Sequence, residues 1–196
     1  MSFLKKARVI VTLKCNRDCE NCCNKEEVFK QHKILTDIND LLSYDEIIIT
    51  GGEPILLCGM LINYLYYLRG KYKKLIFLYS ALYNNEQEYI DILRVVSGLH
   101  FTLHNEAKDK EIDELKKLSS LLLKYKDIYK HLSLRLAIDN RLYDKYDFSN
   151  INFSGWSVVR KMKWLVNAPL PKDEELFVFD LENWYKETHK RKDNNK

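Results

Sequence analysis

Glycine, proline and long apolar runs are all scarce in this chain, and each shortage narrows what the protein can be. Six glycines and three prolines in 196 residues leave few points of interruption, so regular helices and strands should dominate. No apolar run reaches the ~18 residues that a membrane-spanning helix needs. The first fifteen residues also lack the small-residue cleavage site of a signal peptide. We therefore expect a cytoplasmic protein with no membrane partner.

Charge of one sign is not concentrated anywhere along the sequence. The 32 basic and 28 acidic residues are mixed, and the formal net charge is only +4. A dedicated nucleic-acid module usually shows a denser basic face, whereas this mild bias permits contact with a nucleotide or another anion. Hydrophobic residues make up 46%, which is typical of a globular domain that buries enough surface to fold without staples.

Cysteine is rare except in one short stretch. Four of the five cysteines lie between residues 15 and 23, and the fifth is Cys58. A secreted disulfide scaffold would have an even number of cysteines spread along the chain. In a reducing cytoplasm, a cluster of this kind favours metal binding instead.

Strand-like and helix-like segments alternate along the chain. The pattern predicts strands at 7–13, 46–50, 74–80, 99–104, 132–139 and 151–161, the last of them broken near Gly155. It predicts helices at 25–33, 57–72, 84–96 and 108–125, and a helical tail over 170–196 that ends in a frayed, charged segment. This βαβα order predicts an α/β fold, a partial (βα)6 barrel of mostly parallel strands with outer helices. We expect one core domain over 1–165 and a C-terminal extension over 166–196.

The clustered cysteines have a spacing that suits a metal centre. Cys15, Cys19 and Cys22 follow the first strand with three and then two residues between them. A tetrahedral zinc site would need a fourth ligand, from Cys23 or His32. A cubane iron–sulfur cluster would be held by three thiolates through three of its irons, leaving the fourth iron open to a ligand with an amine and a carboxylate.

A second informative motif follows the predicted strand 46–50. Gly51 and Gly52 allow the backbone to approach a ligand closely, and Pro54 fixes the turn. Glu53 places a carboxylate at the C-terminal edge of the strand, where α/β folds bind ligands. A carboxylate at this position suits an ammonium group.

Together the two motifs resemble the radical S-adenosylmethionine (radical SAM) superfamily. "CNRDCENC" matches the family's Cys-x3-Cys-x2-Cys loop, and "GGEP" follows the second strand as it does in that family. The resemblance covers roughly residues 7 to 160. It implies that Cys15, Cys19 and Cys22 ligate a [4Fe-4S] cluster, that SAM chelates the open iron, and that the Gly51–Pro54 motif holds the methionine ammonium. It also implies reductive cleavage of SAM to a 5′-deoxyadenosyl radical, with a flavodoxin or ferredoxin as the reductant.

The chain departs from the family's pattern in two places. Asn21 stands where the family often has an aromatic residue, so the adenine must be held in another way. Cys23 is an additional thiol, which we interpret as a small buried residue. We interpret His32 and Cys58 as structural residues.

Polar residues at or within later strands are further candidates for contact with SAM or substrate. Ser80 and His104 end the third and fourth predicted strands, and each could be either a ligand contact or a plain turn residue. Arg135 interrupts the apolar strand 132–139, where it could face the barrel cavity and bind the SAM carboxylate or an anionic substrate. Asp139 is a weaker candidate of the same kind.

The sequence leaves the substrate open. Too few cysteines remain for an auxiliary cluster, so we expect a single one. A small molecule, a nucleotide or a peptide could be the substrate, and a homodimer or a partner could cover the open side of the barrel. One alternative is an activating enzyme that installs a glycyl radical on a partner protein. Another is a non-catalytic zinc-binding module, although that interpretation leaves "TGGEP" unexplained.

Overall fold

Eight parallel strands form one continuous sheet in the computed structural model, which describes residues 4–19, 22, 25, 32–163 and 169–193. Every pair of neighbouring strands is parallel, and the order across the sheet is β2-β8-β1-β3-β4-β5-β6-β7. The strands are β1 (Lys6–Ile10), β2 (Lys33–Ile34), β3 (Glu46–Thr50), β4 (Leu75–Ser80), β5 (Gly98–Leu103), β6 (Ser133–Asp139), β7 (Val158–Met162) and β8 (Glu174–Val178). The sheet is open, as a partial barrel is, and the predicted α/β class is confirmed.

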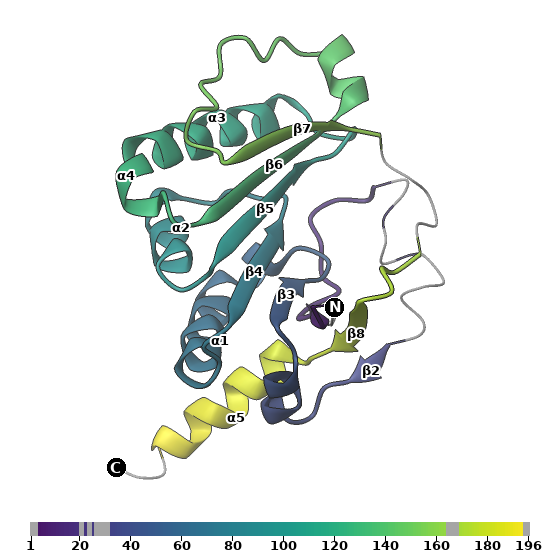
Figure 1. The fold of residues 1–196 in the computed structure, drawn as a ribbon, viewed down its shortest axis with the longest axis vertical. Helices are drawn as coiled ribbons and strands as arrows, with labels where there is room; N and C mark the ends of the chain where they lie inside the picture. The colour runs from purple at the N-terminus through teal and green to yellow at the C-terminus, as the bar shows by residue number, and fades with distance from the viewer. Residues whose placement is uncertain (1–3, 20–21, 23–24, 26–31, 164–168, 194–196) are drawn as a thin grey trace.

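Helices connect the strands and cover one face of the sheet. Figure 1 shows α1, α2 and α3 together on one side of the strands, while the loop that follows β1 lies on the other side. The α-helices are α1 (Cys58–Lys71), α2 (Glu86–Leu93), α3 (Asp109–Lys124), α4 (Lys126–Tyr129) and α5 (Leu181–Asp193). The 3-10 helices with described bounds are η3 (Ile38–Ser43), η4 (Pro54–Leu57) and η5 (Asn140–Asp144).

The two faces of the sheet differ in composition. On β1 and on β3 to β6, most of the residues that point towards the helices are apolar and buried, as Val9, Ile49 and Leu78 are. On the opposite face, the register places Tyr79, His100 and Arg135 side by side on three successive strands. The helix-facing side is therefore the core of the molecule, and the other side is free to carry polar function.

Most predicted elements are confirmed, but the strand count is eight and not six. The predicted strand 151–161 begins only at Val158, since residues 151–157 form turns. The two additional strands are β2 and β8. The predicted helix at 25–33 is wrong at Lys33, which belongs to β2, and its residues 26–31 lie outside the described part of the chain.

The tail of the chain is only partly helical. Glu174–Val178 is β8, which inserts between β1 and β2, and only Leu181–Asp193 forms the expected helix. The acidic residues that suggested a helix make tertiary contacts instead. Glu174 forms an ion pair with Arg8 at 2.8 Å, and Glu175 accepts a hydrogen bond from the Tyr44 hydroxyl at 2.8 Å.

Aromatic side chains fix α5 against α1. Tyr64 of α1 stacks on Phe179, with ring centroids 4.8 Å apart, and meets the edge of Trp184 at 5.2 Å. Tyr64 is fully buried, so this contact belongs to the core. Residues beyond 165 thus contribute both a strand and a packed helix to the same sheet assembly.

Candidate functional site

A pocket of about 140 Å³ lies where the C-terminal ends of β3, β4 and β5 meet the loop after β1. Parallel strands bring their C-terminal ends to one edge of the sheet, which is where ligands bind in this class of fold. The pocket brings together eight of the ten residues that the sequence predicts for a site: Cys15, Cys19, Cys22, Gly51, Gly52, Glu53, Ser80 and His104. Of the other two, Pro54 begins η4 beside Glu53, and Arg135 lies outside the pocket lining.

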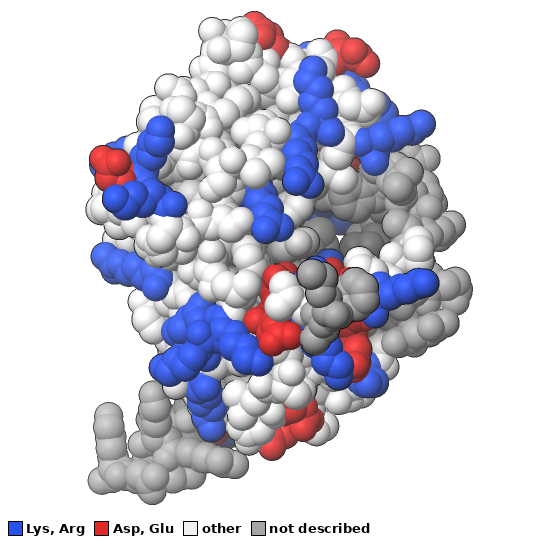
Figure 2. Space-filling model, viewed as in Figure 1, with Lys and Arg blue, Asp and Glu red and all other residues white. Residues whose placement is uncertain are grey.

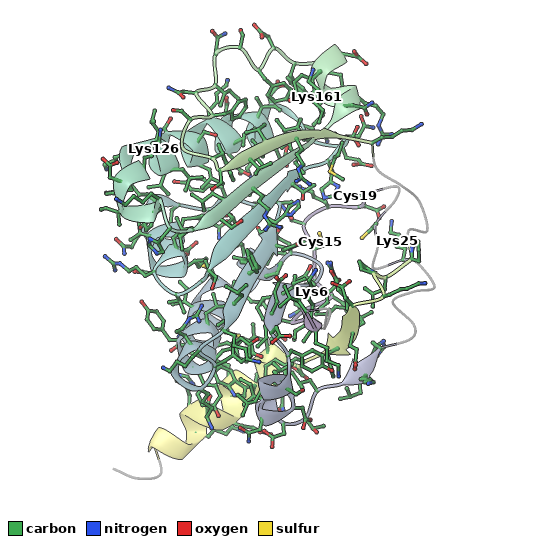
Figure 3. All side chains as sticks on the ribbon, viewed as in Figure 1. Lys6, Cys15, Cys19, Lys25, Lys126 and Lys161 are labelled. Atoms are coloured by element: carbon green, nitrogen blue, oxygen red, sulfur yellow. The ribbon has the colours of Figure 1, made fainter. Side chains whose placement is uncertain are left out.

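Figure 3 shows Cys15 and Cys19 on the segment that follows β1, and Cys22 lines the same pocket. None of the three cysteines forms a disulfide; Cys15 is exposed, and Cys19 and Cys22 are half-buried. Burial, and next the proximity of Glu106, raise the pKa of the Cys19 thiol to about 11. Within the described ranges, no group of three or more His, Cys, Asp or Glu side chains is arranged to hold a metal ion. The thiols therefore share a pocket wall without forming a closed ligand shell.

Of the other residues considered as ligands, Cys58 and His32 lie away from this wall. Cys23 lies outside the described residues. Cys58 is buried at the start of α1, and His32 is exposed before β2, and neither residue lines the pocket.

Two glycines hold the "GGEP" turn against the segment that leads into the cysteine loop. The amide of Gly52 donates to the Thr12 carbonyl at 2.7 Å, and the amide of Glu53 donates to the Lys14 carbonyl at 2.8 Å. A Cβ atom on Gly51 would lie 2.3 Å from the Thr12 oxygen, and one on Gly52 would lie 2.2 Å from the Lys14 oxygen. Gly51 also has a φ of 150°, which favours glycine. The sequence predicts that the glycines let the backbone approach a ligand closely. In the structure they also let the turn after β3 approach the backbone of residues 12–14.

Glu53 is a buried carboxylate in a preorganised environment. Its oxygens accept hydrogen bonds from the Ser80 hydroxyl at 2.7 Å, the Ala81 amide at 2.8 Å and the Ile55 amide at 3.1 Å. Burial raises the pKa of Glu53, and these hydrogen bonds oppose that effect. Since a carboxylate has about four lone-pair sites, one acceptor position remains for a ligand. Ser80 acts here as a positioning residue for Glu53.

Arg17 is a site residue that the sequence argument missed. Its Nη2 atom donates to the Ala81 carbonyl, while Nε and Nη1 are buried and have no hydrogen-bond partner among the described residues. An unsatisfied buried donor costs about 1–3 kcal/mol, and more when it is charged. The unpaired edge of this guanidinium, on the pocket wall, is a ready position for a carboxylate. The available signal was its position between two predicted metal ligands, Cys15 and Cys19.

His104 contributes an uncharged ring to the pocket. Burial, and next the neighbouring Arg17, lower the pKa of His104 to about 4, so the imidazole is neutral at physiological pH. A neutral ring can donate or accept a hydrogen bond to a ligand. The sequence left His104 open between a ligand contact and a turn residue, and the structure places it on the pocket wall.

Arg135 faces the open side of the sheet at some distance along the strands from the cysteine loop. It is exposed, its Nε atom donates to the Ser133 hydroxyl at 2.9 Å, and its guanidinium lies 5.3 Å from the centre of the Phe77 ring. Arg8 lies on the same face and also lines the pocket. The reasoning that singled out Arg135, a cation within an apolar strand, applies equally to Arg8, which the sequence argument overlooked.

No model of a protein family matches the chain, and no curated protein matches it either. Among the described residues, no helix has the length and apolar character that crossing a membrane requires. The function must therefore be argued from the pocket itself.

Proposed function

We propose that this protein is a radical SAM enzyme. The observation that carries the proposal is the pocket in which three cysteines outside any disulfide, the Gly51–Glu53 turn and an unpaired guanidinium edge meet at the ends of the parallel strands. Thiolates are the ligands that iron–sulfur clusters take, so Cys15, Cys19 and Cys22 supply the type and number of ligands for a [4Fe-4S] cluster with one open iron. When bound, the cluster supplies the electron for reductive cleavage of SAM to methionine and a hydrogen-abstracting 5′-deoxyadenosyl radical.

The residues of the pocket account for binding of the amino-acid part of SAM. Glu53 has one free acceptor position, which suits the methionine ammonium, and Ser80 and the Ala81 amide hold the carboxylate in place. Arg17 presents two unpaired N–H groups, which suit the methionine carboxylate. A buried carboxylate and a buried guanidinium in one pocket thus recognise both charges of an amino acid.

The proposal extends to partners that the site does not define. A flavodoxin or ferredoxin in the cytoplasm would deliver the electron, and a small molecule, nucleotide or peptide would give up the hydrogen atom. A homodimer could cover the open face of the sheet.

The proposal is tested by anaerobic reconstitution of the full chain with iron and sulfide. We expect broad visible absorbance that bleaches with dithionite, and 5′-deoxyadenosine after addition of SAM. Cys19→Ala should abolish both signals and leave the fold intact by circular dichroism, because an open catalytic site does not hold the fold together. Cys58→Ala is the matched control, since Cys58 does not line the pocket, and it should keep both signals.

A zinc module would give the opposite result. The chain would bind one zinc ion without colour, SAM would remain intact, and Cys19→Ala would unfold the domain. That outcome would refute the enzymatic proposal.

A further inference from the structure

The open face of the sheet carries arginines within its strands, where apolar residues would be ordinary. Arg8 on β1, Arg135 on β6 and Arg160 on β7 share this face with Tyr79 and His100. Figure 2 shows Lys and Arg side chains distributed over the face seen in Figure 1, with a smaller group of acidic side chains among them. A cluster of cations on the interior face of a partial barrel calls for a charged ligand.

Two of the three guanidinium groups form no ion pair with a carboxylate of the described residues. Arg8 is paired with Glu174 at 2.8 Å, and Lys6, near the start of β1, is paired with Asp173 at 2.8 Å. In contrast, none of the ion pairs in the described part of the chain includes Arg135 or Arg160. Glu46 is the remaining carboxylate on this face that interacts with Arg135, and burial raises its pKa. The face therefore keeps an excess of positive charge.

These side chains are held in position on the sheet. Arg135 lies over the Phe77 ring, and its Nε atom is fixed by the Ser133 hydroxyl. The Arg8 guanidinium lies 5.2 Å from the centre of the Tyr79 ring. Stacking on an aromatic ring reduces the entropy that an arginine loses when it binds an anion.

His100 lies at the centre of this arrangement and adds a neutral hydrogen-bonding group. Its ring packs on Tyr79, with centroids 4.5 Å apart, and its Nδ1 atom is buried without a hydrogen-bond partner among the described residues. Burial, and next Arg135, Arg8 and Arg160, keep the imidazole uncharged by lowering its pKa to about 4. A buried and unpaired ring nitrogen indicates a ligand that is missing from its surroundings.

We propose that the substrate carries an anionic group, a carboxylate or a phosphate, which binds between Arg135, Arg160 and His100 on the open face of the sheet. The inference deepens the proposed function by naming the substrate class, and as a statement about substrate it rests on that function. Arg8 and Tyr79 belong both to this face and to the wall of the cysteine pocket, so the two sites are contiguous. A substrate whose anionic group binds here directs the uncharged part of the molecule towards the three cysteines.

The test is anion binding by the full chain without a cluster, which does not depend on SAM chemistry. Isothermal titration calorimetry with benzoate and its neutral analogue benzamide separates the effect of charge from that of shape. Inorganic phosphate tests whether the site binds a phosphate group as well as a carboxylate. We expect the wild-type chain to bind benzoate or phosphate and to bind benzamide far more weakly. Arg135→Gln and Arg160→Gln should each weaken anion binding about tenfold, the loss expected for one charge-assisted hydrogen bond.

Two controls make the result decisive. Arg135→Lys should restore part of the affinity because it keeps the charge, and Arg94→Gln, which removes an exposed arginine on the helix-covered side, should have no effect. Equal binding of benzoate and benzamide, or an equal loss in Arg94→Gln, would overturn the inference. If anions bind here but the reconstituted chain does not cleave SAM, the proposed function fails while the anion site stands.

Discussion

Individual side chains show how the pocket is prepared before any ligand arrives. Glu53 is buried and already accepts three hydrogen bonds, whereas the Arg17 guanidinium, also on the pocket wall, has two buried N–H groups without partners. Hydrogen bonds therefore stabilise the Glu53 carboxylate in the ligand-free chain, whereas two N–H groups of Arg17 are left unsatisfied. The difference indicates that Arg17 is kept for binding, at a cost to the stability of the fold.

This difference gives a prediction in which stability and binding change in opposite directions. Arg17→Met should raise the free energy of unfolding of the cluster-free chain by about 1 kcal/mol, because two unsatisfied buried donors are removed for one hydrogen bond lost. The same substitution should weaken binding of S-adenosylhomocysteine to the reconstituted protein about tenfold. Urea unfolding and calorimetry measure the two quantities.

Arg94→Gln serves as the control, since it removes an exposed arginine of the helix layer and should change neither quantity appreciably. A less stable Arg17→Met chain that binds the ligand normally would show that Arg17 has a structural role alone.

At this scale the sequence predicted the residues of the pocket better than their contacts. The spacing of the cysteines and the "GGEP" turn were sufficient to locate Cys15, Cys19 and Glu53, because the chemistry depends on residue type and on proximity to strand ends. Arg17 was not predicted because its significance depends on which hydrogen bonds are missing. That information exists only once the chain is folded.

Among the elements, the loop after β1 and the turn after β3 form one unit. Backbone hydrogen bonds from Gly52 and Glu53 join the turn to Thr12 and Lys14, directly before Cys15. The position of the cysteine loop therefore depends on glycines that are distant in sequence. The sequence argument assigned the glycines to ligand approach, since nothing in a linear pattern shows which backbone lies opposite.

Alanine substitutions at two glycines should have opposite effects on stability. Gly52→Ala should lower the free energy of unfolding by about 1–3 kcal/mol, because its Cβ would overlap the Lys14 carbonyl. Gly59→Ala, within α1, should raise stability by up to about 1 kcal/mol, because its Cβ meets nothing within 4 Å and alanine favours a helix. Chemical denaturation of both variants measures the difference, and a Gly52→Ala chain as stable as wild type would contradict the backbone clamp.

The strand β8 shows where local patterns fail to predict an element. Its first two residues are glutamates, which local propensity places in a helix, but Arg8 and Tyr44 engage them across the sheet. Long-range contacts override propensity in this way when a strand's polar residues have partners on other elements. The helices α2 and α3 were predictable because their apolar spacing depends on burial of one face only, and α1 was predictable from its length and apolar content.

The whole molecule separates a buried apolar core on the helix side from a charged face on the other side of the sheet. The alternation of strands and helices was enough to predict the parallel α/β arrangement, because right-handed crossovers leave few alternatives. This alternation could not predict the number of strands, since β2 has only two residues and β8 lies in a tail whose sequence predicts a helix.

The buried imidazole of His100 predicts that the molecule becomes less stable in mild acid. The unfolded chain takes up a proton at this residue near the ordinary pKa of 6.5, whereas the folded chain does so only near pH 4. Stability should therefore decrease as the pH falls from 6.5 to 4, with a contribution from His100 of about 2 kcal/mol at pH 5. Arg8, Arg135 and Arg160 face the ring and oppose its protonation.

Urea unfolding at pH 7 and pH 5 checks this prediction. His100→Gln should lose less stability over that interval than the wild-type chain does. An equal loss in the two chains would mean that other groups cause the acid sensitivity.

The position of β8 also determines when the sheet can be completed during synthesis. β1 emerges from the ribosome before β3 and can pair with it once β3 is made, but its other edge must wait for residues Glu174–Val178. Until those residues are synthesised, that edge presents unpaired backbone groups, which can pair with another chain. The cysteine loop leads directly out of β1, so a nascent chain carries its thiols beside an unfinished edge, and insertion of β8 is the step that closes the edge next to them.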